Sequence, residues 1–170
     1  SGYFGDLKST REVLSPDGWL NTGDLAYRVG NGIVITGREK DLIIINGRNV
    51  WPQDLEFLAE KQPEVRTGDA SAFSIAGHNG EEQAVMMVQC RETDESKRAD
   101  LQGRLHSQVR QEFGVDCLIE LVPRNTLPRT TSGKLSRSGA RKEYLKRVAA
   151  EKLDIPPGDP YAATLRQRAV

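Results

Sequence analysis

The chain has 170 residues, 37% hydrophobic and 28% charged, which is typical of one globular domain or of a small domain with an added segment. Its 24 basic and 24 acidic residues cancel, which argues against a protein that works on nucleic acid, because such proteins usually carry a basic excess. No run approaches the ~20 apolar residues of a membrane span, and the first ten residues lack a signal pattern, so we expect no membrane span and a cytoplasmic location.

The first predicted elements are short strands and one helix. Residues 1–38 contain several glycines and turns, which indicates little helix and the end of another module. Runs of β-branched residues closed by glycine predict strands at 32–37 and 41–47, with a charged surface crossing between them. A helix is predicted over 51–62, where Pro52 suits the first turn and the leucines have helical spacing.

The second half alternates strands and helices. We predict strands at 71–77, 84–90 and 117–122, a helix at 95–113 that Gly114 ends, a loop between Pro123 and Pro128, and a last helix from near 136–138 to about 152. This order predicts an α+β fold. The small domain would have a mixed sheet of about three to five short strands and about three helices, preceded by a β-rich segment.

The cysteines and histidines give no sign of a metal site. Cys90 and Cys117 lie 27 positions apart in apolar runs, which fits neither metal-ligand spacing nor a disulfide framework, so we expect buried free thiols. His78 and His106 are isolated from other candidate ligands. The sequence therefore predicts no metal site.

The loop 127–138, LPRTTSGKLSRS, contains one lysine after a glycine. A phosphate-binding P-loop requires glycine where this chain has Pro128 and a serine or threonine where it has Leu135, so the loop is not a P-loop. Its small hydroxyl residues and Gly133 are typical of a flexible arm that carries the Lys134 ammonium into a cleft. An ordinary solvated lysine is the alternative.

Three motifs follow one another along the chain: TGD at 22–24, GREKD at 37–41 and TSGK at 131–134. The first lies within the longer stretch DGWLNTGDL and the last within LPRTTSGKL. Together they resemble the adenylate-forming superfamily of acyl-CoA synthetases, luciferases, non-ribosomal adenylation domains and fatty-acyl-AMP ligases. The resemblance runs from about residue 2 to about residue 147. It implies that a carboxylate attacks the α-phosphate of ATP, forming acyl-AMP and releasing pyrophosphate.

The resemblance also implies roles for individual residues. Lys134 would be the catalytic cation beside the reacting phosphate, where a preorganised charge stabilises the transition state. Asp24 would accept hydrogen bonds from the ribose hydroxyls, Arg38 would face the ribose and phosphates, and Ile35 would offer an apolar contact. Lys40 matches the hinge about which the C-terminal domain swings, although a charged crossing residue would look the same.

The same resemblance predicts the domain organisation. Residues 1–39 would end the large N-terminal domain, 40–150 would form the mobile C-terminal domain, and 151–170 would be a tail. The full-length enzyme would use ATP, AMP and Mg²⁺, but its phosphate loop and acyl pocket would lie in the missing N-terminal domain. We therefore expect the isolated chain to be inactive and to bind no cofactor tightly.

Residues 43–56, IIINGRNVWPQDLE, are most similar to the fatty-acyl-AMP ligases. In thioester-forming relatives Gly47 would line the pantetheine path, and some relatives carry basic residues where this chain has isoleucines. This favours a fatty acid substrate and transfer to an acyl-carrier protein rather than to coenzyme A. Val50-Trp51 departs from the histidine-tyrosine usual in that branch. The alternatives are an acyl-CoA synthetase domain and a non-catalytic module that docks a carrier protein.

Residues 124–147 form a basic stretch with one acidic residue, Glu143. The stretch either steers ATP or an acidic carrier protein, or is a solvated helix face; no aromatic platform accompanies it, so nucleic acid is disfavoured. Its eight basic residues are Arg124, Arg129, Lys134, Arg137, Arg141, Lys142, Lys146 and Arg147.

Overall fold

The computed structural model describes residues 2–77 and 80–153, with side chains as far as Ala149. His78 and most of the predicted tail lie outside the described residues. The chain divides into two compact units between Leu42 and Ile43.

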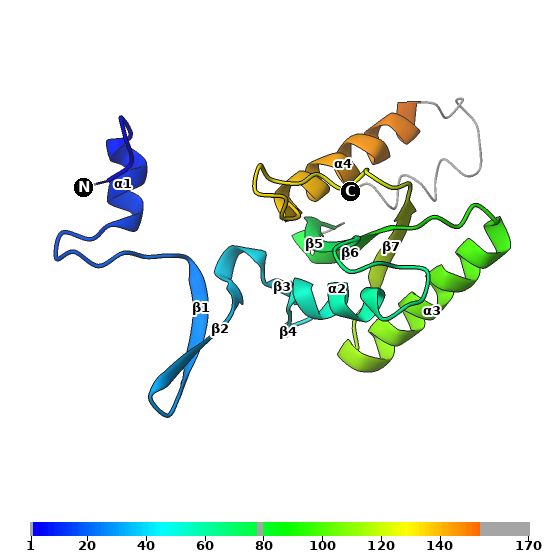
Figure 1. Ribbon diagram of the computed structural model, residues 1–170, viewed down its shortest axis with the longest axis horizontal. Helices are drawn as coiled ribbons and strands as arrows, with labels where there is room; N and C mark the ends of the chain where they lie inside the picture. Colours follow the sequence, from blue (N-terminus) through cyan, green and yellow to red (C-terminus); the bar gives the residue numbers. More distant parts are fainter. Residues whose placement is uncertain (1, 78–79, 154–170) are drawn as a thin grey trace. The chain divides into compact units, whose positions relative to one another are not determined.

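The described residues of the first unit form one short α-helix and one β-hairpin (Figure 1). Helix α1 (Leu7–Val13) begins after Asp6, whose side chain accepts a hydrogen bond from the Ser9 amide at 2.9 Å. Strands β1 (Asp24–Val29) and β2 (Gly32–Arg38) pair antiparallel, and the 3-10 turn η1 (Glu39–Asp41) follows. The strand predicted at 32–37 is confirmed, whereas α1 and β1 were not predicted because charged residues interrupt their apolar pattern.

The second unit begins with a small hairpin of β3 (Ile43–Ile45) and β4 (Arg48–Val50). Asn46 and Gly47 form its turn with φ of 51° and 73°, the left-handed conformation that two-residue hairpin turns require. The strand predicted at 41–47 is thus shorter, and β4 was not predicted because it has only three residues.

The main sheet is mixed, as the sequence predicts. Strand β6 (Glu82–Gln89) is central, with β5 (Ala70–Ala76) antiparallel on one side and β7 (Cys117–Val122) parallel on the other. Helix α3 (Glu95–Phe113) is the crossover that joins the two parallel strands. Together with α2 (Pro52–Glu60) and α4 (Arg137–Leu153), it confirms the predicted α+β domain with three helices.

Both faces of this sheet are buried, because α2 and α3 cover one face and α4 covers the other (Figure 1). Residues of β6 alternate between the two cores: Met86 packs with the leucines of α2 and α3, and Met87 packs with Phe73 and Tyr144. The Phe73 and Tyr144 rings meet edge to face with centroids 5.9 Å apart. Cys90 and Cys117 are free and buried, as predicted.

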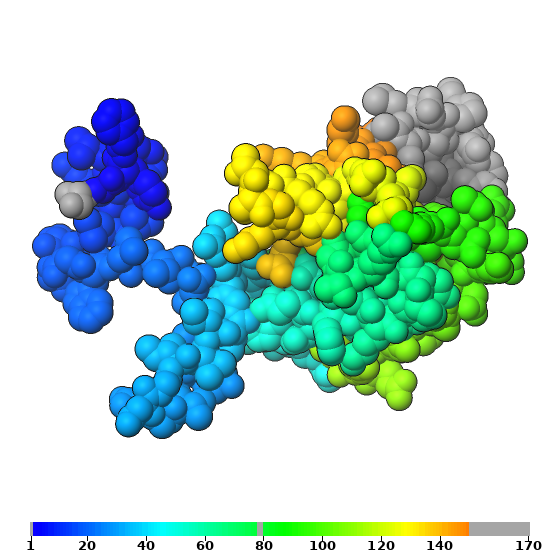
Figure 2. Space-filling view, viewed as in Figure 1, coloured from blue at the N-terminus to red at the C-terminus, as the bar shows by residue number. Residues whose placement is uncertain are grey.

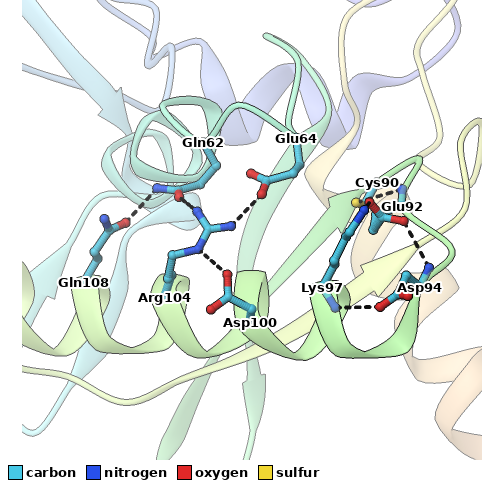
Figure 3. A network of polar contacts seen from close by, with 9 residues as sticks. All are labelled: Gln62, Glu64, Cys90, Glu92, Asp94, Lys97, Asp100, Arg104 and Gln108. Atoms are coloured by element: carbon cyan, nitrogen blue, oxygen red, sulfur yellow. Dashed lines mark hydrogen bonds and ion pairs between the residues drawn. The ribbon is translucent and has the colours of Figure 1, made fainter.

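A polar network ties α3 to the segment after α2 (Figure 3). The Arg104 guanidinium donates to Asp100 at 2.9 Å, to Glu64 at 2.6 Å and to Gln62, and Gln62 donates to Gln108 at 2.8 Å. The hydrogen bond to Asp100, and next the contact with Glu64, raise the pKa of Arg104.

None of the helices in the described ranges is long and apolar enough to span a membrane.

Candidate functional site

Lys134 lies in a hydrogen-bonded hairpin, residues 129–135, which we call the lysine hairpin. Arg129 and Leu135 form an antiparallel bridge, the Thr130 amide donates to the Lys134 carbonyl at 2.8 Å, and the Gly133 amide donates to the Thr130 carbonyl at 2.8 Å. Gly133 has φ of 80°, which a side chain would disfavour. These main-chain bonds define a hairpin at the position where the sequence suggests a flexible arm.

Arg129 fastens this hairpin to the body of the second unit. Its guanidinium donates to the Gly133 carbonyl at 3.0 Å and to the Gly68 carbonyl, before β5, at 2.7 Å. Asp69 lies 3.8 Å from the same guanidinium. One side chain thus bridges the residue before Lys134 and the start of the main sheet.

The base of the hairpin is held by a second, buried link. Asp69 accepts a hydrogen bond from the Gln89 amide group at 2.7 Å, and the Gln89 side-chain oxygen accepts from the Leu127 amide at 3.0 Å. Both hydrogen bonds are buried, and water does not readily replace a buried hydrogen bond. The loop therefore enters the hairpin from a fixed point at the end of β6.

Lys134 itself is exposed, and its ammonium makes no hydrogen bond or ion pair within residues 2–77 and 80–149. The part of the chain that contains the hairpin stands at the surface, yellow in Figure 2. An ordered backbone with a free cation at its turn is the arrangement that can present one charge to an anion at low entropic cost.

The first unit brings Asp24 and Arg38 together. They are opposite each other in the β1–β2 register, and the Arg38 Nε lies 3.3 Å from the Asp24 Oδ1. The side chains remain 30% and 55% exposed, so both keep surface that a ligand can contact. Ile35 is exposed on the same hairpin.

A hollow of about 250 Å³ in this unit is lined by Thr22, Gly23, Arg38 and Lys40, among others. Drug-sized ligands usually occupy ~300–1,000 Å³, so this hollow is smaller than a complete nucleotide pocket. Lys40 lies in the turn η1 and is exposed. The first unit therefore offers at most one side of a nucleotide site.

The other residues predicted for the site, Gly47 and the basic stretch 124–147, lie in the second unit. Gly47 is the exposed second residue of the β3–β4 turn. In the basic stretch, Arg137 pairs with Glu56 at 2.7 Å and Arg147 with Glu120 at 3.0 Å, so these two arginines, like Arg129, hold the fold together. Within the described residues no group of three or more His, Cys, Asp or Glu side chains could hold a metal ion.

Sequence reasoning missed the anchoring role of Arg129 and the buried link through Asp69 and Gln89. The contacts of Arg129 with Gly68 and of Leu127 with Gln89 span 61 and 38 positions in the chain. The only sequence signal was local: an arginine directly after Pro128, two residues beyond Leu127.

No protein-family model matches the chain. It is 47% identical over 146 residues to a Caulobacter vibrioides protein named "Putative acyl-CoA synthetase", covering 85% of this chain and 25% of that protein. It is 33% identical over 157 residues to the medium-chain-fatty-acid–[acyl-carrier-protein] ligase JamA of Moorena producens, covering 85% of this chain and 26% of JamA.

Solved structures are also similar to this chain over most of its length. A chain from the study of fatty acyl-adenylate ligases from E. coli and L. pneumophila is 46% identical with a TM-score of 0.76, covering 89% of this chain and 26% of the other. The McyG A-PCP structure with phenylalanyl-adenylate is 28% identical with a TM-score of 0.79, covering 98% and 26%. The chain thus spans about a quarter of the length of these relatives.

Proposed function

This chain belongs to the adenylate-forming superfamily, with acyl-CoA synthetases, fatty-acyl-AMP ligases and non-ribosomal adenylation domains, and we propose that it supplies the C-terminal lid of an acyl-adenylating ligase. The observation that carries the proposal is Lys134: its exposed ammonium has no partner among the described residues, and it lies on a hairpin whose backbone is fixed by Arg129. A solvated surface lysine has no need of such an anchor.

In the proposed reaction a fatty acid carboxylate oxygen forms a bond to the α-phosphorus of ATP, and the bond to the leaving pyrophosphate breaks. Negative charge increases on the phosphate oxygens in the transition state. The Lys134 ammonium would be placed beside those oxygens when the lid closes, where a preorganised cation stabilises the transition state more than the bound substrates.

On the nucleotide side, Asp24 and Arg38 would act as a pair. The Asp24 carboxylate would accept hydrogen bonds from the ribose hydroxyls, and the Arg38 guanidinium 3.3 Å away would orient it and face the phosphates. Ile35, exposed on the same hairpin, would provide an apolar contact beside the nucleotide. Mg²⁺ would accompany the triphosphate, with ligands from outside this chain.

The exposed apolar surface of the first unit supports its assignment to a larger domain. Helix α1 has no buried residue, and Phe4, Trp19, Ile33 and Ile35 are each more than half exposed. Such side chains normally pack against a further body of protein. We therefore propose that residues 1–39 end the N-terminal domain, that 40–150 form the lid, and that Lys40 is the hinge.

For the acyl acceptor we propose a carrier protein, reached along a path past Gly47. Ile44 is half exposed, and its amide donates to the Glu82 carboxylate at 2.9 Å, so one negative charge lies beside β3. That charge disfavours the 3′-phosphate of coenzyme A. The name of the Caulobacter relative favours an acyl-CoA synthetase as the second candidate.

The test is Lys134→Ala in the full-length parent with ATP, Mg²⁺ and a panel of fatty acids, read as pyrophosphate release. We expect adenylation to fall by about two to three orders of magnitude, the usual effect of removing one transition-state donor. Lys142→Ala, an exposed lysine of α4, is the matched control and should leave the rate unchanged. Unchanged acyl-AMP formation in Lys134→Ala would instead favour a non-catalytic carrier-docking module.

The acceptor is tested with the wild-type parent. Preformed acyl-AMP is offered coenzyme A or a phosphopantetheinylated carrier protein, and thioester formation is measured. Faster transfer to the carrier supports the ligase branch, and faster transfer to coenzyme A supports the synthetase. In the first assay, with ATP and the fatty acids, the isolated 170-residue chain should release no pyrophosphate.

A further inference from the structure

Three arginines lie at one edge of the main sheet. Arg66 precedes β5 by four residues, while Arg91 follows β6 and Arg124 follows β7, each by two residues. The strands end together there: the Cys90 amide donates to the Val122 carbonyl at 3.0 Å, and the Gln89 amide donates to the Asp69 carbonyl at 2.7 Å. Because β6 and β7 are parallel, this is their carboxyl edge, where open sheets commonly bind ligands.

We call these three residues the arginine cluster. Their side chains hold no other described part of the chain in place. Arg66, Arg91 and Arg124 are exposed, and none of their guanidinium groups makes a hydrogen bond or ion pair with any described part of the chain. The charges of Arg124 and Arg66 lower the pKa of the Arg91 guanidinium, and Asp69 only partly opposes them. Other arginines of this unit, such as Arg129 and Arg137, are paired.

The cluster borders a concave surface. A hollow of about 490 Å³ is lined by Arg91, Arg98 and Arg124, together with Cys90, Glu92, Thr93 and Pro123. This volume falls within the ~300–1,000 Å³ of small-molecule sites. Arg98 is fixed at its rim, because its guanidinium donates to the Glu92 carbonyl at 3.1 Å and to the Leu121 carbonyl at 2.8 Å.

Glu92 is the acidic residue of the lining, and its carboxylate already has donors. One of its oxygens accepts from the Thr93 and Asp94 amides at 3.0 Å each, and the other lies 3.5 Å from the Lys97 ammonium (Figure 3). These bonds, above all the one from Asp94, lower the pKa of Glu92. Its charge is therefore committed to the start of α3 and does not neutralise the arginines.

We propose that the arginine cluster and the hollow beside it bind a compact phosphate-class oxyanion, either free or as the phosphate ester of a larger molecule. Guanidinium groups from separate segments can each offer two parallel N–H donors to such an oxyanion, which also removes their mutual repulsion. An extended acidic protein surface fits less well, because Arg91, Arg98 and Arg124 line one hollow instead of spreading along a face.

The site is tested on the 170-residue chain itself, so the result does not depend on the adenylation reaction. Inorganic phosphate, pyrophosphate, glycerol 3-phosphate and hexaglutamate are titrated at low salt, and binding is followed by amide chemical shifts. We expect pyrophosphate to bind most tightly and to shift the amides around 91–93 and 123–125. In Arg91→Gln/Arg124→Gln the dissociation constant should rise at least tenfold, and in the matched control Arg141→Gln it should change less than twofold.

The source of the anion is read from the same titrations. Tighter binding of glycerol 3-phosphate than of inorganic phosphate indicates an esterified ligand, and the reverse indicates a free anion; both support the site. Tightest binding by hexaglutamate would replace the proposal with an acidic protein partner. Equal affinity in the wild type and in Arg91→Gln/Arg124→Gln would overturn it.

Folding of the variant is checked by thermal melting without added anion. Because the arginines repel one another, Arg91→Gln/Arg124→Gln should melt at the same temperature as the wild type or higher, while pyrophosphate should raise the melting temperature of the wild type alone. If the double variant is unfolded, Arg124→Gln takes its place and should weaken pyrophosphate binding at least threefold. No loss in that folded variant would equally reject the site.

Discussion

Arg137 and Glu56 form a two-point ion pair: the arginine Nε lies 2.8 Å from Oε1, and Nη2 lies 2.7 Å from Oε2. The Glu56 Oε1 also accepts from the Ala72 amide at 3.0 Å. One carboxylate therefore joins α2, β5 and Arg137, the first residue of α4, which lies two residues beyond the lysine hairpin. The Glu56 side chain is only 14% exposed, so water can replace few of the hydrogen bonds that its carboxylate accepts.

Glu56→Ala should destabilise the second unit. The substitution removes two charge-assisted bonds and leaves Arg137 and the Ala72 amide without that acceptor, so we expect a loss of about 2 kcal/mol in the free energy of unfolding. Urea denaturation of the chain measures it. Glu112→Ala, at an exposed position on α3, is the control and should change stability by less than ~0.5 kcal/mol. Equal midpoints for the two variants would refute the structural role of Glu56.

Arg129 should act on adenylation through Lys134. Arg129→Ala removes the bonds to the Gly133 and Gly68 carbonyls, so the lysine hairpin loses its fixed position. In the full-length parent we expect kcat to fall by about tenfold or more with little change in the KM for ATP, because misplacement of about 1 Å can cost ~100-fold.

A double-mutant cycle separates this positioning role from general instability. In the Lys134→Ala background, Arg129→Ala should lower the rate little further, because its effect requires the ammonium. Arg129→Lys should restore part of the rate in the Lys134 parent. Fully additive losses would show that Arg129 does not act through Lys134.

The sequence predicts best those elements whose pattern is long and regular. Strands β5 and β6 and helix α3 are found within about two residues of their expected bounds, because the two strands are short, mainly apolar runs bounded by polar or turn residues, the apolar residues of α3 repeat with helical spacing, and Gly114 marks its end. Helix α1 and strand β4 escape prediction, since α1 buries nothing and β4 has three residues.

The candidate site, too, could be predicted from the sequence only in part. Lys134, Asp24 and Arg38 could be proposed from contiguous motifs, but the order of the loop around Lys134 could not. That order depends on Gly68, Asp69 and Gln89, which lie tens of positions away and meet the loop only after β5 and β6 have paired. The arginine cluster is equally invisible in the sequence, because three separated strand ends bring it together.

Helix α3 offers two glycines that should respond in opposite directions. Gly103 has ordinary helical geometry and open space where a side chain would begin, so Gly103→Ala should stabilise the chain by about 0.5–1 kcal/mol. Gly114 ends the helix with φ of 64°, and an added Cβ would lie 2.6 Å from the Arg48 guanidinium. Gly114→Ala should therefore destabilise by at least ~1–2 kcal/mol. Thermal melts of both variants decide; a shift of the same sign in both would be the contrary result.

Cys117 should make stability fall at alkaline pH. Burial of its side chain raises the thiol pKa from 9.0 to about 12, so the folded chain keeps the neutral thiol while the unfolded chain ionises. The stabilisation is complete below pH ~9 and is lost as pH rises from there toward ~12; between pH ~8 and ~10 the loss should be about 1 kcal/mol. Urea unfolding of the wild type and of Cys117→Ala at both pH values measures it, because other ionisations are common to the two. The wild type should lose more stability than the variant, and parallel losses would mean that the thiol is accessible to water in the folded chain.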